Sequence, residues 1–146
     1  MLDESLGFQL SRTARKISQL LANRFEPHGI TTEQWAVLQR LAERDGVTQK
    51  ELASRAEKDQ TNMTRILDQL ERKGLVVRRP NEEDRRSFLI FGTSKGDRLA
   101  AELAPTERAE IEALLEGLPA ERIAAFRETL DHMWKKACIR VESERE

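Results

Sequence analysis

The chain has 146 residues, of which 38% are hydrophobic and 35% are charged, with a formal net charge of −1. This size and composition fit one soluble, helix-rich domain with an appended helical part. No apolar run approaches the ~18 residues of a membrane span, and the first residues lack the basic start and apolar core of a signal peptide. A single cysteine, Cys138, excludes an intrachain disulfide and fits the reducing cytoplasm, where we expect the protein to act.

Charge is unevenly distributed along the chain. Residues 58–95 carry nine Lys/Arg and six Asp/Glu, a local surplus of three positive charges on an otherwise acidic chain. A net charge near zero argues against a general nucleic-acid coat, while a basic middle segment can direct one surface toward phosphate. Taken alone the asymmetry is small, and a solvated helix face explains it equally well.

The first predicted element is a long helix that begins at Leu2 or Glu4 and ends near residues 27–28. Gly29, followed by Ile30, is typical of a helix stop. Apolar side chains recur along this helix at steps of three and four residues, at Leu6, Leu10, Ala14, Ile17, Leu21 and Phe25.

Two shorter helices are predicted next. Thr31 and Gln34 have the spacing of a capping box for the second helix, which ends at Gly46. Thr48 and Glu51 have the same spacing at the start of a third helix over residues 48–58. The inward side chains are Trp35, Leu38, Leu41 and Ala42 in the second helix and Leu52, Ala53 and Ala56 in the third.

The fourth predicted helix is short and amphipathic. It begins after Asp59 as the N-cap and is closed by Gly74. Its apolar face holds Met63, Ile66, Leu67 and Leu70. Its other face carries Gln60, Thr61, Asn62, Thr64, Arg65, Gln69 and Arg72. The third helix, a turn and this helix together predict a helix-turn-helix unit.

A charged β-hairpin is predicted after the fourth helix. Its strands are residues 75–79 and 88–91, joined by the polar turn 80–87, with Arg85 and Arg86 near the tip. A helix with polar side chains and arginine outward, followed by such a hairpin, suits a DNA groove and the adjacent backbone. This is the shape of a winged helix-turn-helix.

Two helices are predicted after the hairpin. Thr93 can cap the first, over residues 94–117, with a kink or break just before Pro105. Pro119 fits the first turn of the last helix, which runs to about Val141 before a frayed, charged end. The apolar side chains are Leu99, Leu103, Ile111, Leu114, Leu115 and Leu118 in the first, and Ile123, Phe126, Leu130, Met133 and Trp134 in the second.

The terminal helices carry more apolar surface than a compact winged helix can bury. We therefore expect residues 1–30 and 94–146 to form a helical dimerisation region and residues 31–93 to form the DNA-binding region, intertwined as one domain in a twofold homodimer. The alternative is one larger, monomeric helical core.

The most distinctive stretch is R-I-L-D-Q-L-E-R-K-G-L-V-V-R-R followed by N-E-E-D-R-R-S-F-L-I-F-G-T-S-K-G. Its pattern is an aspartate, any residue and an arginine, then a strand, then Thr-x-x-Gly. These are Asp84-Arg85-Arg86, Phe88 to Phe91 and Thr93 to Gly96. In this pattern and in its order of helices, essentially the whole chain resembles the MarR/SlyA family of bacterial winged-helix regulators. Asn81-Glu82 is a departure, because Asp-Pro is common there in the family, and it affects turn geometry more than chemistry.

The resemblance implies a mainly α fold with a small β-hairpin wing, and a homodimer held by its first and last helices. It also implies a sequence-specific transcriptional regulator, usually a repressor, bound to a pseudo-palindromic operator in double-stranded DNA. Many members release DNA when a small phenolic or other aromatic acid binds between the two regions.

Three sets of residues are predicted to contact DNA. The N-terminal turns of the fourth helix read base edges in the major groove through Gln60, Thr61, Asn62, Thr64 and Arg65. In the wing, Arg86 enters an A·T-rich minor groove beside Arg85, and Asp84 holds Arg86 extended through a charge-assisted pair. The candidate phosphate contacts are Thr48, Gln49, Lys50, Arg65, Arg72, Lys73, Arg78, Arg79 and Arg85.

Each assignment has a plainer alternative. The polar face of the fourth helix and the wing arginines could simply be solvated, and Arg72 and Lys73 could complement the helix C-terminus. Asp68 and Glu71 would repel DNA, which favours insertion of the other end of the helix, and Asp68 can instead pair with Arg72.

An effector pocket could form near the first and second helices. Phe8, Trp35 and Leu38 could supply its walls, and Arg12 could anchor an anionic ligand. All except Arg12 fit an ordinary core equally well.

The remaining reactive side chains do not suggest a site. Cys138 fits an incidental or structural cysteine better than a redox sensor, because the hydroperoxide-sensing branch of the family carries its cysteine in the first helix, where Gly7 stands here. His28 and His132 have no metal-ligand cluster around them, so no metal is expected. No nucleophile–base arrangement or phosphate loop supports an enzyme, and no cofactor is expected. The alternatives are a winged helix that binds another protein, and an effector-blind regulator of the same fold.

Overall fold

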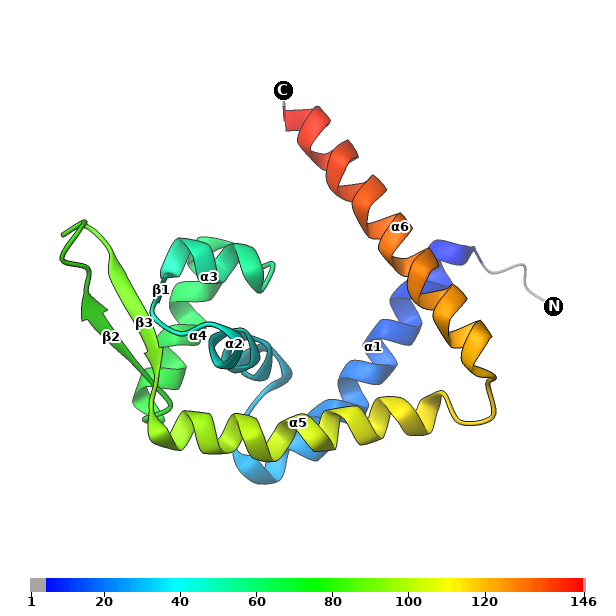
Figure 1. The fold of residues 1–146 in the computed structure, drawn as a ribbon, viewed down its shortest axis with the longest axis horizontal. Helices are drawn as coiled ribbons and strands as arrows, with labels where there is room; N and C mark the ends of the chain where they lie inside the picture. Colours follow the sequence, from blue (N-terminus) through cyan, green and yellow to red (C-terminus); the bar gives the residue numbers. More distant parts are fainter. Residues whose placement is uncertain (1–4, 146) are drawn as a thin grey trace. The chain divides into compact units, whose positions relative to one another are not determined.

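The computed structural model describes residues 5–145. The elements in chain order are α1 (Leu6–Phe25), η1 (Glu26–His28), α2 (Thr32–Glu43), β1 (Val47–Thr48), α3 (Gln49–Arg55), α4 (Gln60–Arg72), β2 (Val76–Pro80), β3 (Phe88–Gly92), α5 (Ser94–Leu114) and α6 (Ala120–Arg145) (Figure 1). The chain divides into one unit that ends at Arg108 and a second that begins at Ala109. This mainly helical fold with a small sheet confirms the predicted fold class.

The sheet is antiparallel, has three strands and has the order β1-β3-β2. Arg78 of β2 and Val47 of β1 both pair with Ile90 of the central strand β3. The predicted hairpin forms β2 and β3 and extends beyond the helices of its unit (Figure 1). Pro80 belongs to β2 rather than to the turn, and it is tolerated there because β2 is an edge strand that needs no further backbone donor. The sequence did not predict β1, whose two residues are too few to show a pattern.

The hydrophobic core of the first unit lies between α2, α3, α4 and the sheet. Met63, Ile66, Leu67 and Leu70, the predicted apolar face of α4, are each 0% exposed. They pack with the buried residues Val37, Leu38 and Leu41 of α2, Leu52 and Ala53 of α3, and Val47, Val76 and Ile90 of the sheet. Burial of four large side chains fixes α4 along one face, so its opposite face is presented outward.

Four predicted N-caps are confirmed, and one of them is Thr93, which accepts from Gly96 N at the start of α5. The Thr31 hydroxyl accepts from the backbone N of Gln34, and Gln34 Oε1 accepts from the backbone N of Thr31, which completes the capping box of α2. Thr48 and Asp59 likewise cap α3 and α4 by accepting from backbone N–H groups three residues on. These bonds satisfy donors that the first helical turn leaves unpaired.

The connection from β3 to α5 depends on Gly96. The Thr93 hydroxyl accepts from Gly96 N at 3.1 Å and donates to Gly74 O at 2.7 Å. A Cβ atom on Gly96 would lie 2.2 Å from the carbonyl oxygen of Leu75. Only glycine therefore fits this position, which explains the Thr-x-x-Gly pattern in packing terms.

Some predicted helix boundaries are wrong. A break before Pro105 does not occur, because α5 continues through it. Proline deprives only the carbonyl of Ala101 of its partner, and Ala101 is exposed to water. The last helix extends past Val141 to Arg145 instead of fraying. Pro119 precedes that helix and accepts hydrogen bonds from its first turn.

The start of the first helix falls partly outside the described residues. The predicted starts at Leu2 and Glu4 lie there, and the described helix begins after Ser5 as its N-cap. At the other end, α1 stops at Phe25 and a 3₁₀ turn follows, closed by Gly29 with a φ of +68°. The predicted glycine stop is confirmed.

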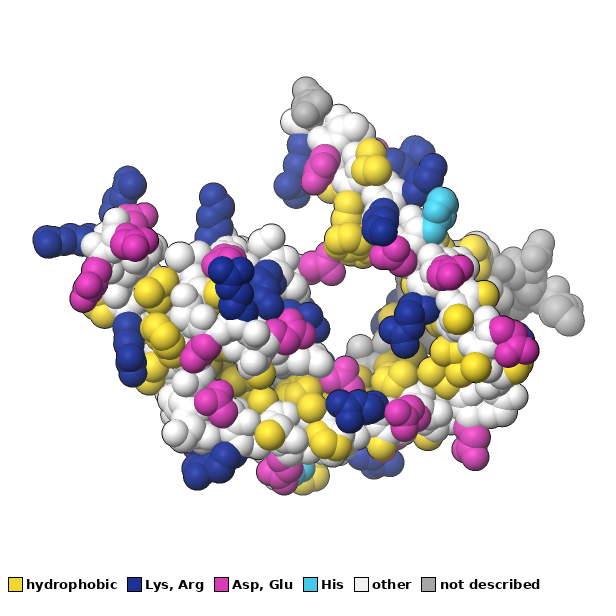
Figure 2. Space-filling view, in the orientation of Figure 1, with side chains coloured by type: hydrophobic (Ala, Val, Ile, Leu, Met, Phe, Trp, Pro, Cys, Tyr) yellow, Lys and Arg dark blue, Asp and Glu magenta, His cyan; other side chains and the backbone are white. Residues whose placement is uncertain are grey.

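Two helices leave most of their apolar side chains uncovered within this chain. In α1 only Phe25 is buried, and in α6 no described residue is. Apolar side chains lie on the surface of α6, as Figure 2 shows. The exposed ones in these two helices are Leu6, Phe8, Phe126, Leu130, Met133, Trp134, Ile139 and Val141. Within residues 5–145, no helix has the length and apolarity needed to cross a membrane.

Candidate nucleic-acid interface

The outward face of α4 carries the predicted base-reading residues. Gln60, Thr61, Thr64 and Arg65 are exposed, and Asn62 is half-buried. Gln49 of α3 donates through Nε2 to Thr64 Oγ1 at 2.6 Å, so the structure brings a predicted phosphate contact against this face. The arrangement leaves amides, hydroxyls and a guanidinium at the N-terminal half of α4. These groups match the hydrogen-bonding edges of bases.

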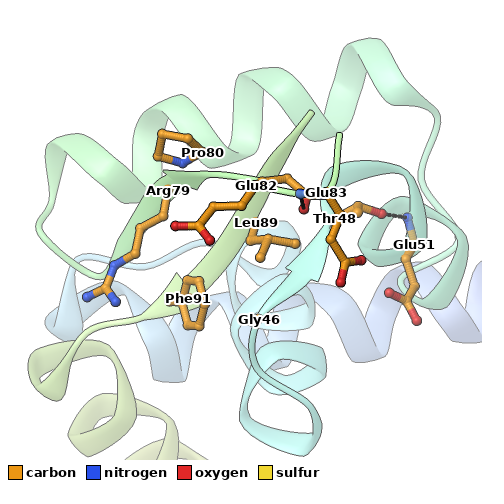
Figure 3. Close-up of a pocket in the computed structure, with 10 residues that line it drawn as sticks. Gly46, Thr48, Glu51, Arg79, Pro80, Glu82, Glu83, Leu89 and Phe91 are labelled. Atoms are coloured by element: carbon orange, nitrogen blue, oxygen red, sulfur yellow. Dashed lines mark hydrogen bonds between the residues drawn. The ribbon is translucent and has the colours of Figure 1, made fainter. Parts of the chain in front are cut away.

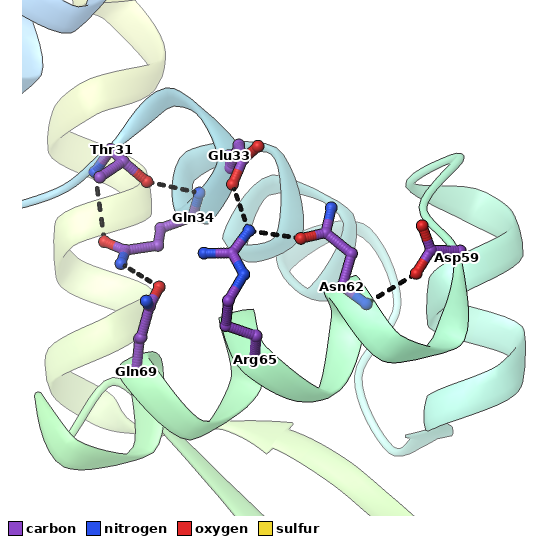
Figure 4. Close-up of polar contacts among 7 residues, drawn as sticks. All are labelled: Thr31, Glu33, Gln34, Asp59, Asn62, Arg65 and Gln69. Atoms are coloured by element: carbon purple, nitrogen blue, oxygen red, sulfur yellow. Dashed lines mark hydrogen bonds and ion pairs between the residues drawn. The ribbon is translucent and has the colours of Figure 1, made fainter.

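Arg65 does not extend freely into solvent. Its Nη2 lies 2.8 Å from Glu33 Oε2 of α2, and the same nitrogen donates to Asn62 Oδ1 (Figure 4). Two predicted base-reading side chains are therefore joined to each other and to a carboxylate that sequence reasoning missed. Glu33 and Arg65 are far apart in the chain, so no local pattern indicates their pairing.

Arg78 links the wing to α4. Its Nη1 lies 2.8 Å from Asp68 Oδ1 and 3.6 Å from Glu71 Oε1, and its side chain is only 18% exposed. The structure thus pairs Asp68 with Arg78, whereas the sequence suggested a pair with Arg72. Arg78 offsets the two carboxylates of α4 that would repel DNA.

Lys73, the C-cap residue of α4, donates to two oxygen atoms outside its own helix. Its Nζ lies 2.5 Å from Gly29 O and 2.7 Å from Gln34 Oε1. Gln34 is 3% exposed, and its Nε2 donates to Gln69 Oε1 at 2.9 Å (Figure 4). Lys73 therefore ties α4 to the start of α2, in addition to the phosphate contact that the sequence predicts for it.

Replacement of Lys73 by methionine is expected to lower the free energy of unfolding by about 1–2 kcal/mol, because Gly29 O loses this bond and buried Gln34 Oε1 loses one partner. Urea denaturation of the purified variant measures the change. Lys50→Met, which removes an exposed lysine from α3, is the matched control and should differ little from wild type. Equal stability of the two variants would show that the Lys73 bonds contribute nothing.

The wing tip is built around Asp84. Its Oδ1 accepts from the backbone N of Arg86 at 3.1 Å and lies 3.5 Å from Arg86 Nε, while the Arg86 side chain is 94% exposed. The turn is closed by Asn81, whose Oδ1 accepts from Glu83 N and whose Nδ2 donates to Ser87 Oγ. Basic and acidic side chains both gather at this tip (Figure 2). The predicted pairing of Asp84 with Arg86 is present.

A groove of mixed charge is lined by the wing and by the start of α3. Arg79 lies over the Phe91 ring, 5.0 Å from its centre. The groove has a volume of about 530 Å³, and Thr48, Glu51, Glu82, Glu83 and Leu89 also line it (Figure 3). Three carboxylates beside one guanidinium do not favour phosphate. Among the other candidate contacts, Lys50, Arg72 and Arg85 are exposed.

Comparison of the chain with known proteins identifies its family. A sequence model of the MarR family matches residues 30–88. The solved transcriptional regulator PA3341 is 31% identical, over 91% of this chain and 98% of its own, with a TM-score of 0.80. The chain belongs to the MarR family. It is a transcriptional regulator of the winged-helix type rather than an enzyme.

Two further solved structures similar to this MarR-family chain contain bound partners. CouR from Rhodococcus jostii RHA1, solved with p-coumaroyl-CoA, is 28% identical over 91% of this chain and 94% of its own, with a TM-score of 0.79. MepR from S. aureus, solved in complex with DNA, is 23% identical over 92% of this chain and 99% of its own, with a TM-score of 0.87.

The four residues predicted for an effector pocket lie in different settings in this MarR-family fold. Trp35 and Leu38 are 3% and 2% exposed. Trp35 packs on Phe25, with ring centres 5.5 Å apart, and donates through Nε1 to Glu107 Oε2 at 2.5 Å. Phe8 is 49% exposed on α1, where the Arg12 guanidinium lies 5.6 Å from its ring centre.

Trp35 also lines an open depression of about 580 Å³ beside α2 and α5. The charged side chains lining it are Glu43, Asp45 and Asp97, which do not favour an anionic ligand. Elsewhere, Cys138 is half-buried in α6. Within residues 5–145, no group of three His, Cys, Asp or Glu side chains is arranged to hold a metal ion.

Proposed function

We propose that this MarR-family regulator is a repressor that binds a pseudo-palindromic operator as a homodimer and is released by a small aromatic or phenolic effector. The observation that carries the proposal is the pairing of α4 with the wing. The apolar face of α4 is buried, which directs its amide and guanidinium groups outward, and Arg86 stands exposed at the hairpin tip.

Recognition by α4 and the wing uses different grooves. The N-terminal half of α4 is proposed to enter the major groove, with the wing arginines in the adjacent minor groove, where negative potential is strongest. A protein of the same fold, MepR, has been solved with DNA. Two recognition helices must then be held at the spacing of successive major grooves, about 34 Å.

Homodimerisation is supported by the uncovered apolar side chains. Residues 1–30 and 94–146 are proposed as the dimerisation region and residues 31–93 as the DNA-binding region. These bounds differ from those of the two compact units of the chain, which meet between residues 108 and 109. Apolar side chains on helices that one chain does not cover are usually buried against a partner, most often by a twofold axis.

Replacement of Leu130 by glutamate is expected to convert the homodimer to monomer. Leu130 lies with Phe126, Met133 and Trp134 on an exposed stripe of α6, and a buried charge without a partner opposes association. Light scattering after size exclusion measures the mass, and circular dichroism confirms that the helices persist. Lys136→Glu, elsewhere on α6, is the control. A monomeric wild-type protein would reject the dimer.

Selection of duplexes from a random-sequence pool by the wild-type protein tests the proposed DNA binding. Enrichment of an inverted repeat, with affinity that falls steeply as salt rises, is the expected result. A winged helix used only to bind another protein would show neither sequence preference nor a steep salt slope.

An effector is tested by its effect on the bound complex. The known complex of CouR with p-coumaroyl-CoA makes aromatic acids and their thioesters the first compounds to try. Release of the selected duplex and a raised melting temperature with one of them would support the proposal. If none has either effect, the regulator is effector-blind toward this class.

A further inference from the structure

We propose that Glu33 determines DNA-binding specificity by holding Arg65 in position to read a base instead of a phosphate. This inference rests on the proposed DNA binding by α4, but assigns a new role to a residue outside that helix. Glu33 lies in the first turn of α2, and the Arg65 side chain extends from α4 to its carboxylate (Figure 4).

The contacts form a three-residue unit. Arg65 Nη2 donates both to Glu33 Oε2, at 2.8 Å, and to Asn62 Oδ1. Asn62 is itself placed by the N-cap of α4, since its backbone N donates to Asp59 Oδ1 at 2.7 Å. Glu33 and Arg65 are 46% and 51% exposed, so the unit is ordered by its contacts and still accessible to a ligand.

The hydrogen-bonding capacity of this unit favours guanine. A guanidinium has only donors, so Asn62 must turn its oxygen toward Arg65. The groups left to face DNA are Asn62 Nδ2 and the remaining N–H groups of Arg65, all of them donors. Guanine presents two acceptors in the major groove, O6 and N7, whereas adenine presents one acceptor and one donor. Each operator half-site should therefore contain a guanine opposite this unit.

The carboxylate also changes the electrostatics of α4. A lone arginine on a recognition helix is attracted to any phosphate, which raises affinity for all sequences alike. Glu33 offsets that charge and repels phosphate from its surroundings, so Arg65 contributes chiefly where a base offers hydrogen-bond acceptors. Specificity increases because binding to the wrong sequences is weakened.

Glu33→Gln tests the inference, with a duplex enriched by the wild-type protein and a shuffled duplex of the same composition as probes. The variant should bind the shuffled duplex more tightly. Its ratio of specific to shuffled affinity should fall about fivefold, the lower end of what one bidentate base contact contributes. The slope of log affinity against log salt should steepen by about one, because one more cation becomes available to phosphate.

Glu43→Gln is the matched control. It removes a carboxylate from the same helix, one that pairs with Arg40 and Arg55 at 3.1 and 3.2 Å, away from α4. Its affinity ratio and salt slope should remain those of wild type. In an Arg65→Ala background, Glu33→Gln should no longer lower the ratio, because the two residues act as one unit.

Three results would overturn the inference: an unchanged ratio and slope in Glu33→Gln, the same loss in the Arg65→Ala background, or an enriched duplex without a common guanine in each half-site. Slower rotation of the Arg65 guanidinium in wild type than in Glu33→Gln, measured by NMR on the free protein, checks the contact without DNA. A wild-type protein that enriches no duplex would instead reject the proposed function.

Discussion

Replacement of Arg86 by alanine is expected to lower operator affinity by roughly ten- to hundred-fold, the range of one charge-assisted hydrogen-bonding group, while fold and dimer persist. The side chain is 94% exposed and pairs with Asp84 of the wing itself, so its removal leaves the core untouched. Affinity falls because the guanidinium is the group proposed to enter the minor groove. The loss should be larger in A·T-rich flanks, where that groove is narrow.

A fluorescence titration of the selected duplex at fixed salt measures this loss. Arg86→Lys keeps the charge without the planar fork and should be intermediate. Asp84→Ala should also weaken binding, because Asp84 Oδ1 accepts from the backbone of Arg86 and orients its side chain. Arg98→Ala removes an exposed arginine from α5 and serves as the control. Unchanged affinity in Arg86→Ala would count heavily against a role for the wing.

Replacement of Gly96 by alanine is expected to lower the free energy of unfolding by about 3 kcal/mol or more, or to prevent folding. The added Cβ would lie 2.2 Å from Leu75 O and 3.1 Å from Leu75 C. Both are backbone atoms, so no side chain can rotate to relieve the clash. The start of α5 must move away from the segment that follows α4.

Urea denaturation followed by circular dichroism measures this change, with expression yield as the readout if the variant does not fold. Gly7→Ala is the matched control, because it also adds one Cβ to a helical glycine but meets nothing within 4 Å. It should be neutral or stabilising by up to ~1 kcal/mol. A Gly96→Ala protein as stable as wild type would show that the backbone tolerates the displacement.

The sequence predicted well those features that depend on local chemistry. The apolar face of α4 follows from helical spacing, and the caps at Thr31, Thr48 and Asp59 follow from a hydroxyl or carboxylate three residues before a free N–H. The Asp84–Arg86 pair is likewise a contact between near neighbours in one turn.

Features that depend on distant parts of the chain were not predicted. Strand β1 has two residues and exists because β3 pairs with it, more than forty residues later. Long side chains also find partners that no spacing reveals. Arg78 reaches Asp68, Lys73 reaches Gly29 O, and Arg65 reaches Glu33. Helix α5 continues through Pro105, and Ala101, whose carbonyl the proline leaves without a donor, is exposed.

The contacts of Arg78 limit where regulation can act. Because the Arg78 guanidinium of β2 pairs with two carboxylates of α4, the wing and α4 would move together as one rigid DNA-binding unit. An effector that abolishes DNA binding would then not act by separating the wing from α4. It would change the distance between the two DNA-binding units of the proposed homodimer. Each unit could still bind a half-site, but the two could not bind both half-sites together.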